Sequence, residues 1–123
     1  MNRKARRLQD WVADIREARR NIESDIGSIS EEQFLVDGKT LRAVTKSLSD
    51  IGEAANPIMA LAPQWQETHP AAWDHLRRVY AMRHVLAHGY FRIDAGVVWA
   101  TVKLDLPLPE SVLDRLPELD TEE

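Results

Sequence analysis

The sequence predicts an all-α protein, a four- to five-helix up-down bundle that forms a single domain over residues 1–123. Apolar residues recur at three- and four-residue steps along most of the chain, which is the period of an amphipathic helix. No stretch alternates as a strand would, and no internal repeat is present. With 123 residues, of which 44% are hydrophobic, the chain is long enough to bury one modest core.

The first predicted helix spans about residues 3–26 and ends at Gly27. Its apolar stripe consists of Leu8, Trp11, Val12, Ile15, Ala18, Ile22 and Ile26. Ser30, followed three residues later by a glutamine, is a capping-box pattern. It predicts a short turn from which Phe34 and Leu35 enter the core.

Asp37 is the predicted cap of a second long helix. Its apolar stripe consists of Leu41, Val44, Thr45, Leu48, Ile51, Ala55, Ile58 and Met59. Pro57 should kink the helix or restart it near Asn56, because proline lacks the N–H and clashes with the preceding turn. Residues 62–70 are predicted to form a loop; the four tryptophans belong mostly to the core, with Trp65 in this loop as the candidate for exposure.

A third helix should run from about residue 71 to 87, where Gly89 favours termination. Its candidate core residues are Trp73, Leu76, Val79, Tyr80 and Val85. Asp94 caps a predicted fourth helix. That helix should turn Val97, Val98, Thr101 and Leu104 inward. Residues 105–123 are predicted to form a short helical turn and an acidic tail.

Composition excludes several classes of protein. There is no cysteine, so no disulfide, thiol nucleophile or cysteine metal site is possible. No apolar run approaches the roughly 18 residues that span a bilayer, and no apolar stretch follows the basic start as in a signal peptide. We therefore expect a cytoplasmic protein that is not embedded in a membrane.

Charge is unevenly distributed along the chain. The net charge of −4 taken alone argues weakly against nucleic-acid binding. However, residues 1–20 carry seven Lys/Arg and three acids, whereas residues 105–123 carry seven acids and one Arg. Residues 74–103 carry five Lys/Arg and two Asp. A polyanion would meet these local patches rather than the mean charge, although solvated helix faces are the alternative interpretation.

The segment from Arg83 to Tyr90 holds an arginine, two histidines and a tyrosine at a predicted helix end. Arginine matches phosphate geometry, and the imidazoles of His84 and His88 can transfer protons near neutral pH. These residue types favour a phosphodiester-handling site. The alternatives are cations that complement the helix dipole and an aromatic residue of the core.

Arg83 and Tyr90 lie about 20° apart on a regular helix, whereas Arg83 and His88 lie about 140° apart at ~100° per residue. One regular helix therefore cannot direct Arg83 and His88 at the same phosphate. Either Gly89 lets the last turn deviate, or two copies of the segment face each other across a symmetric dimer.

Gly52 and Glu53 in the second helix form a second candidate feature. Glycine inside a helix costs about 1 kcal/mol relative to alanine, so close approach of a neighbouring helix is the expected compensation. The Glu53 carboxylate could then orient Arg83 or a histidine; an exposed charge and a buried structural pair are the alternatives. No metal-ligand spacing, Gly-rich phosphate loop or Gly-x-Ser-x-Gly turn is present, which leaves phosphodiester chemistry without a metal or cofactor.

Four features follow one another in an order typical of one family: Phe34 to Asp37, Ile51-Gly52-Glu53-Ala54-Ala55, Trp73, and Arg-x4-His-x-Tyr from Arg83. Through these features the chain resembles the HepT-like ribonuclease toxins of the HEPN superfamily. Phe91 to Asp94 and Val98-Trp99 are similar to that family's lead into the last helix. The resemblance covers nearly the whole chain. In one departure, the residue after the signature arginine is His84 instead of the frequent asparagine.

The resemblance implies a homodimer in which two signatures face each other, and a metal-independent endoribonuclease that acts through Arg83 and His88. The 2′-hydroxyl of RNA would be the nucleophile. It further implies a toxin–antitoxin pair in which a nucleotidyltransferase antitoxin adenylylates Tyr90. His84 and Glu53 are possible supporting residues. The alternative is a non-catalytic helical dimer that binds a nucleotide or positions a nucleotidyltransferase; growth arrest that depends on Arg83 and His88 would distinguish the toxin from it.

Overall fold

The computed structural model describes residues 7–88 and 94–104, except the side chains of residues 87, 88 and 104. This part of the chain contains six helices and no strand, which confirms the all-α prediction. The helices are α1 (Leu8–Ile26), α2 (Glu31–Leu35), α3 (Gly38–Leu61), α4 (Trp65–Thr68), α5 (Pro70–His88) and α6 (Ala95–Leu104). The tail predicted at 105–123, with its helical turn, lies outside the described residues. None of the described helices combines the length and the apolarity that crossing a bilayer requires.

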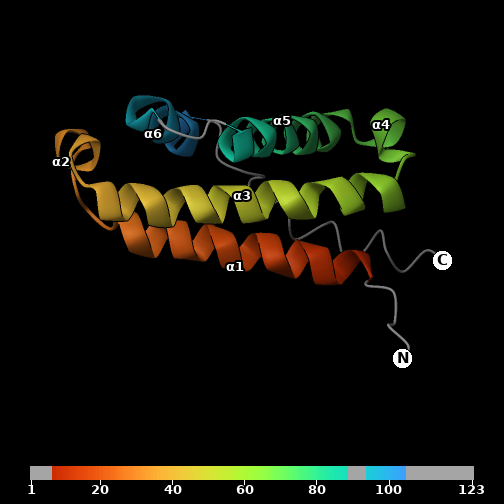
Figure 1. Ribbon diagram of the computed structural model, residues 1–123. Helices are drawn as coiled ribbons and strands as arrows, with labels where there is room; N and C mark the ends of the chain where they lie inside the picture. Colours follow the sequence, from red (N-terminus) through yellow and green to blue (C-terminus); the bar gives the residue numbers. More distant parts are fainter. Residues whose placement is uncertain (1–6, 89–93, 105–123) are drawn as a thin grey trace.

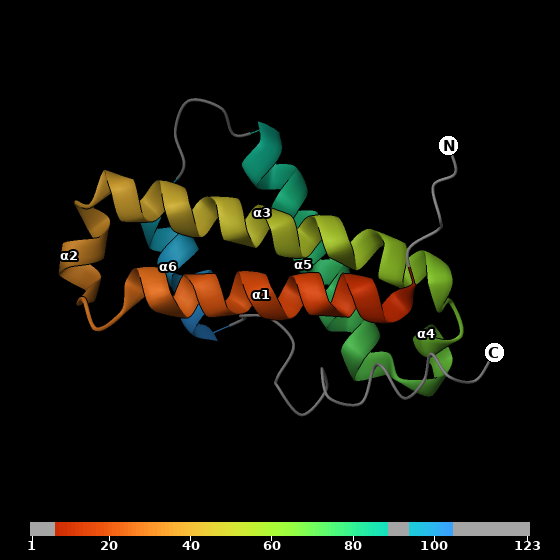
Figure 2. The same cartoon turned by 90° about the horizontal axis from the view of Figure 1, so that it is seen from below.

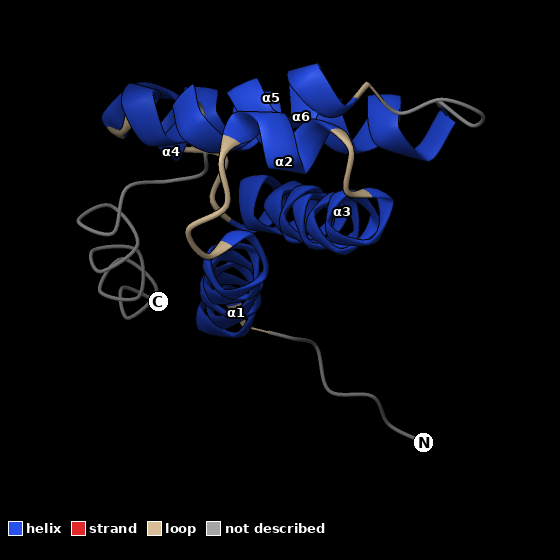
Figure 3. Cartoon of the chain, turned by 90° about the vertical axis from the view of Figure 1, so that its left-hand side faces the viewer, coloured by secondary structure: helices blue, strands red, loops and turns tan. Residues whose placement is uncertain are grey.

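Helix α3 is the centre of the bundle. α1 runs antiparallel along one side of it, and α5 crosses it on the other side (Figures 1 and 2). Seen from the end, α1, α3 and the remaining helices form three successive layers (Figure 3). The short α2 reverses the chain between α1 and α3, and also contacts α6. Since α3 packs against α5 as well as α1, the size of the α3 side chains at the crossing limits how closely α5 can approach.

The core confirms most of the apolar stripes. Phe34 and Trp65 are the largest of its fully buried side chains. The ring of Phe34 lies 5.2 Å from the ring of Trp99, so this aromatic pair joins α2 to α6. Leu35, which was expected in the core, is 45% exposed, because the five-residue helix α2 buries only Phe34.

Three predicted caps are present. The Ser30 hydroxyl accepts a hydrogen bond from the Gln33 backbone N–H at 3.1 Å, and the Gln33 side chain completes the capping box. The Asp37 carboxylate accepts from the Thr40 backbone N–H at 3.0 Å. Asp94 accepts from the Gly96 backbone N–H at 2.9 Å. Each cap satisfies an N–H that a helix start leaves unpaired.

The restart predicted near Asn56 is wrong, because α3 continues through Pro57 to Leu61; the kink predicted as the other outcome stays a prediction. Proline cannot donate to the carbonyl of Glu53, so the helix loses one internal hydrogen bond there. The adjacent Ala55 and Ile58 are both completely buried. Packing on both sides of α3 therefore maintains the helix across the proline.

The loop predicted for residues 62–70 is also wrong in part, since α4 forms within it. Trp65 starts this one-turn helix and is only 1% exposed, contrary to the expectation that it could be exposed. Its burial supplies the free energy that orders a short segment between two prolines.

Three apolar side chains that were expected in the core lie at the surface. Tyr80 is 36% exposed, Val85 61% and Val97 51%. α5 meets α3 through the face that carries Leu76 and Val79, and Val85 lies about 180° from Leu76 at ~100° per residue. Tyr80 stands at the edge of that face, where it is half covered.

Candidate active site at the crossing of two helices

The candidate site is built around Arg83, where α5 crosses α3. The Arg83 side chain is 31% exposed, so its base is covered by the crossing while its end reaches solvent. Arg83 lies seven residues after the buried Leu76, which places both on the face of α5 that packs on α3. This arginine is therefore a partly desolvated cation held by a helix–helix contact.

Gly52 makes this contact possible. A Cβ at position 52 would collide with the Cβ of Arg83 and would lie 2.7 Å from the backbone oxygen of Val79. No side chain can occupy that space unless the two helices move apart. The prediction that Gly52 permits close approach of a neighbouring helix is thus confirmed, and the neighbour is the helix turn that carries Arg83.

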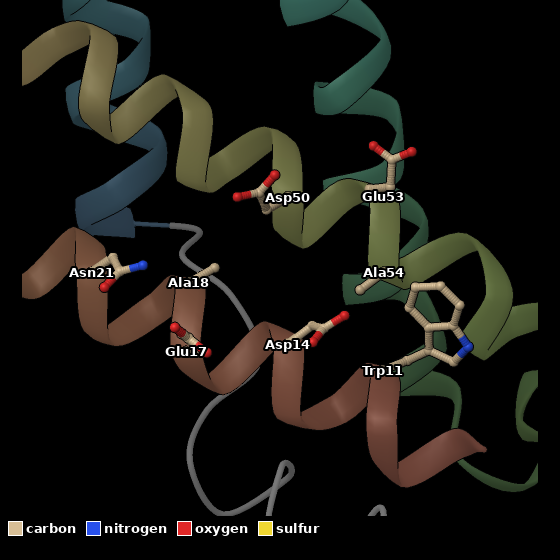
Figure 4. Close-up of a pocket in the computed structure, with 8 residues that line it drawn as sticks. All are labelled: Trp11, Asp14, Glu17, Ala18, Asn21, Asp50, Glu53 and Ala54. Carbon is tan, nitrogen blue, oxygen red and sulfur yellow. The ribbon is translucent and has the colours of Figure 1, made fainter. Parts of the chain in front are cut away.

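Glu53 follows Gly52 and supplies the charged partner of Arg83. A guanidinium nitrogen of Arg83 lies 3.7 Å from a carboxylate oxygen of Glu53, and the Glu53 side chain is 62% exposed. In Figure 4 the Glu53 carboxylate points away from α1. The contact is compatible both with orientation of Arg83 and with an exposed charge, so the orienting role of Glu53 stays a prediction. At 3.7 Å the pair does not occupy the guanidinium as a short bidentate pair would.

The Nε–H group of Arg83 is buried and has no hydrogen-bond partner within the described part of the chain. An unpartnered buried N–H is costly unless a ligand or water accepts from it. Because the Nε atom itself is buried, an anion could accept from it only if the side chain moved.

The other residues of the signature are described to different extents. His84 is exposed on α5. His88 is the last residue of α5; its side chain and all of Tyr90 lie outside the described residues. The structure therefore brings Arg83 together with Glu53, and the pairing of Arg83 with His88 or Tyr90 stays a prediction.

An acidic groove of about 390 Å³ lies between α1 and α3, on the far side of Glu53 from α5 (Figure 4). Its carboxylates are Asp14, Glu17, Asp50 and Glu53. A hydrogen bond to Asp50 raises the pKa of Lys46 above its ordinary value. Within the described ranges, no group of three or more His, Asp or Glu side chains is arranged to hold a metal ion.

The sequence analysis did not predict this groove, although the spacing of its acidic residues is visible in the sequence. Asp14 and Glu17 are three residues apart on α1, as are Asp50 and Glu53 on α3, so each pair lies on one helix face. Which faces meet is a tertiary property. Two of its carboxylates, those of Asp50 and Glu53, form ion pairs with Lys46 and Arg83.

Comparisons with known proteins place the chain among known families. The model of the family described as "Ribonuclease HepT-like" matches residues 15–116. The chain is 38% identical to the "Probable ribonuclease HepT" of Thermococcus cleftensis, over 88% of this chain and 94% of that protein. It is also 32% identical to a candidate RNase of Methanocaldococcus jannaschii, over 81% of this chain and 78% of the relative.

A candidate RNase of Caldanaerobacter subterraneus is 31% identical over 67% of this chain and 69% of its own length. No solved structure matches the chain significantly. The family match covers the helices that carry Gly52, Glu53 and Arg83. On this evidence, the chain belongs to the HepT-like ribonuclease family.

Proposed function

We propose that this protein is a metal-independent endoribonuclease toxin, in which Arg83 binds the scissile phosphate and His88 transfers protons. The observation that carries the proposal is the position of Arg83, which Gly52 admits to the helix crossing and which lies 3.7 Å from the Glu53 carboxylate. The family match supplies RNA as the substrate.

The reaction needs only groups that the chain and the RNA provide. A base, for which His88 is the candidate, removes the proton of the 2′-hydroxyl, and the 2′-oxygen attacks the adjacent phosphorus. The bond from phosphorus to the 5′-oxygen breaks, and the leaving oxygen takes a proton from an acid. The products are a 2′,3′-cyclic phosphate and a 5′-hydroxyl. Arg83 stabilises the charge of the pentacoordinate transition state.

The regular course of α5 supports a site shared between two chains. α5 is helical as far as His88, so Arg83 and His88 remain about 140° apart at ~100° per residue. The C-terminal end of α5 also extends beyond α3 on the side away from α1, where a second copy can meet it (Figure 2). In a symmetric dimer, Arg83 of one protomer would act with His88 of its partner.

RNA cleavage in EDTA tests the activity. The wild-type protein should cut single-stranded RNA to cyclic-phosphate ends, and should leave DNA, which lacks the 2′-hydroxyl, intact. Arg83→Ala and His88→Ala should each lower the rate at least about 100-fold, the usual contribution of one such group. Cleavage that disappears in EDTA and persists in His88→Ala would refute this mechanism.

We further propose that a partner nucleotidyltransferase silences the toxin by adenylylating Tyr90. An AMP group two residues beyond His88 adds a bulky anion that would pair with Arg83 and exclude RNA. Intact mass should rise in steps of one AMP when the protein, ATP and the cognate transferase are combined. Modification that is unchanged in Tyr90→Phe would show that the site is elsewhere.

A further inference from the structure

We propose that Tyr80 is a base-stacking subsite for single-stranded RNA, next to the phosphate bound at Arg83. The inference rests on the proposed ribonuclease function and assigns to the same site a second substrate contact. It explains why an aromatic ring that the sequence predicted for the core is 36% exposed on α5.

The position of Tyr80 relative to Arg83 is the first argument. The two residues are three apart on one continuous helix, so their Cβ atoms are neighbours at about 5–6 Å. In RNA, a base is separated from its own phosphate only by the sugar. A strand whose phosphate contacts Arg83 therefore places an adjacent base within reach of the Tyr80 ring.

The packing of α5 is the second argument. Val79, directly before Tyr80, is 8% exposed, and Leu76, one turn earlier, is completely buried. The contact of α5 with α3 is thus satisfied by aliphatic side chains and leaves one side of the tyrosine in solvent. An exposed ring stacks on any base, because every base has a π-face, and this suits a nuclease without base-specific contacts.

Charge on the two sides of Arg83 is the third argument. Among the described residues, the groove on the α1 side is lined by four carboxylates and no basic side chain, whereas helix α5 carries three arginines and one aspartate. Arg77 lies one turn before Tyr80, and His84 lies one turn after it and is exposed. Arg77 pairs with Asp74 at 2.8 Å, but both side chains are about half exposed or more, so a phosphate can compete for this arginine. RNA is consequently guided along the side of α5 that holds Tyr80.

The binding test uses a fluorescent single-stranded oligonucleotide with 2′-O-methyl riboses, which cannot be cleaved by 2′-hydroxyl attack. Its anisotropy reports the Kd for the wild-type protein, Tyr80→Ala, Tyr80→Phe and Val85→Ala. Tyr80→Ala should weaken binding roughly 5- to 100-fold, whereas Tyr80→Phe, which keeps the ring, should stay within about twofold. Val85 is 61% exposed on the same helix but on the side away from Arg83, so Val85→Ala is the matched control.

A probe with one abasic position distinguishes stacking from a structural effect. The wild type should lose affinity when the stacked base is removed, and Tyr80→Ala should lose nothing further, because each change removes the same contact. With cleavable RNA, Tyr80→Ala should raise KM and leave kcat within about threefold, as expected for a group that binds substrate and transition state equally.

Equal affinity of Tyr80→Ala and wild type for the probe would overturn the subsite. So would a Tyr80→Ala protein that changes its mass in light scattering, because the ring would then cover a second copy of the chain. If the wild type cuts RNA in EDTA and either result is obtained, only the subsite fails. If the wild type neither binds the probe nor cuts RNA, the proposed function fails with it.

Discussion

The exposed carboxylate of Glu53 gives the active-site hypothesis its most direct test at the scale of single residues. Replacement by Gln removes the charge that restrains Arg83 but preserves the shape of the side chain. Since Glu53 is 62% exposed, the free energy of unfolding should change by no more than about 0.5 kcal/mol. A misplaced Arg83 should nevertheless reduce kcat for RNA cleavage, by about 10- to 100-fold.

Asp50→Asn is the control for this substitution. Asp50 lies one turn before Glu53 on α3 and binds Lys46 at 2.9 Å. If the lower kcat of Glu53→Gln came only from the loss of one negative charge in the groove, Asp50→Asn would lower kcat to the same extent. An unaltered kcat in Glu53→Gln would leave the carboxylate as a surface charge without a positioning role.

At the scale of helices, Gly52 decides how α3 and α5 cross. Gly52→Ala places a Cβ 2.7 Å from the Val79 oxygen, and the overpacking should cost about 1–3 kcal/mol. The gain of about 1 kcal/mol from replacing a helical glycine offsets part of this. Denaturant unfolding should therefore show a net loss of stability of up to about 2 kcal/mol, together with reduced cleavage. Gly38→Ala, at the start of the same helix, would meet only the flexible end of Arg42 and should be tolerated.

The cap of α3 predicts a dependence of stability on pH. Hydrogen bonds from the Thr40 backbone and side chain lower the pKa of Asp37 below its ordinary value of 3.8. A lowered folded-state pKa means that the ionised form is favoured by folding, so its stabilisation is present above the unfolded pKa and is lost as the pH falls through the folded pKa.

The comparison of wild type with Asp37→Ala tests this linkage. The difference in Tm should be largest near neutral pH and should shrink below pH ~4. Asp37→Asn retains a capping oxygen that does not titrate, so its advantage over Asp37→Ala should stay constant with pH. A wild-type advantage that is equal at neutral and acidic pH would exclude the charge as its source.

At the scale of the whole molecule, the proposed dimer predicts that two inactive variants restore activity when they are combined, because each active site takes residues from both chains. If Arg83 acts with His88 of the partner, a heterodimer of Arg83→Ala and His88→Ala subunits contains one intact site. Subunits that are unfolded and refolded together at equal amounts should recover roughly a quarter of the wild-type activity, because half of the dimers are mixed and each has one of two sites. Arg83→Ala refolded with the Arg83→Ala/His88→Ala double variant should recover none. Failure of the first mixture to recover would place both residues in the same chain.

Local signals in the chain predicted most of the helices and their starts. Ser30, Asp37 and Asp94 cap helices by contacts that span two or three residues, and such contacts can be inferred without a fold. The helix at Pro57 could not be predicted in this way. A local rule ends a helix there, but the burial of the neighbouring Ala55 and Ile58 outweighs the missing hydrogen bond.

The candidate site, like the helices, could be predicted from the sequence only in part. The Arg-x4-His-x-Tyr spacing from Arg83 and the small residue at Gly52 can be recognised in the sequence alone. They contribute to the family resemblance. That Gly52 faces Arg83, that Glu53 is its ionic partner and that Tyr80 stays exposed all depend on how α5 lies across α3. Gly52 and Arg83 are about thirty residues apart in the sequence, and the way their helices cross depends on many weak side-chain contacts. Those contacts exist only in the folded protein, so the tertiary structure decides the crossing.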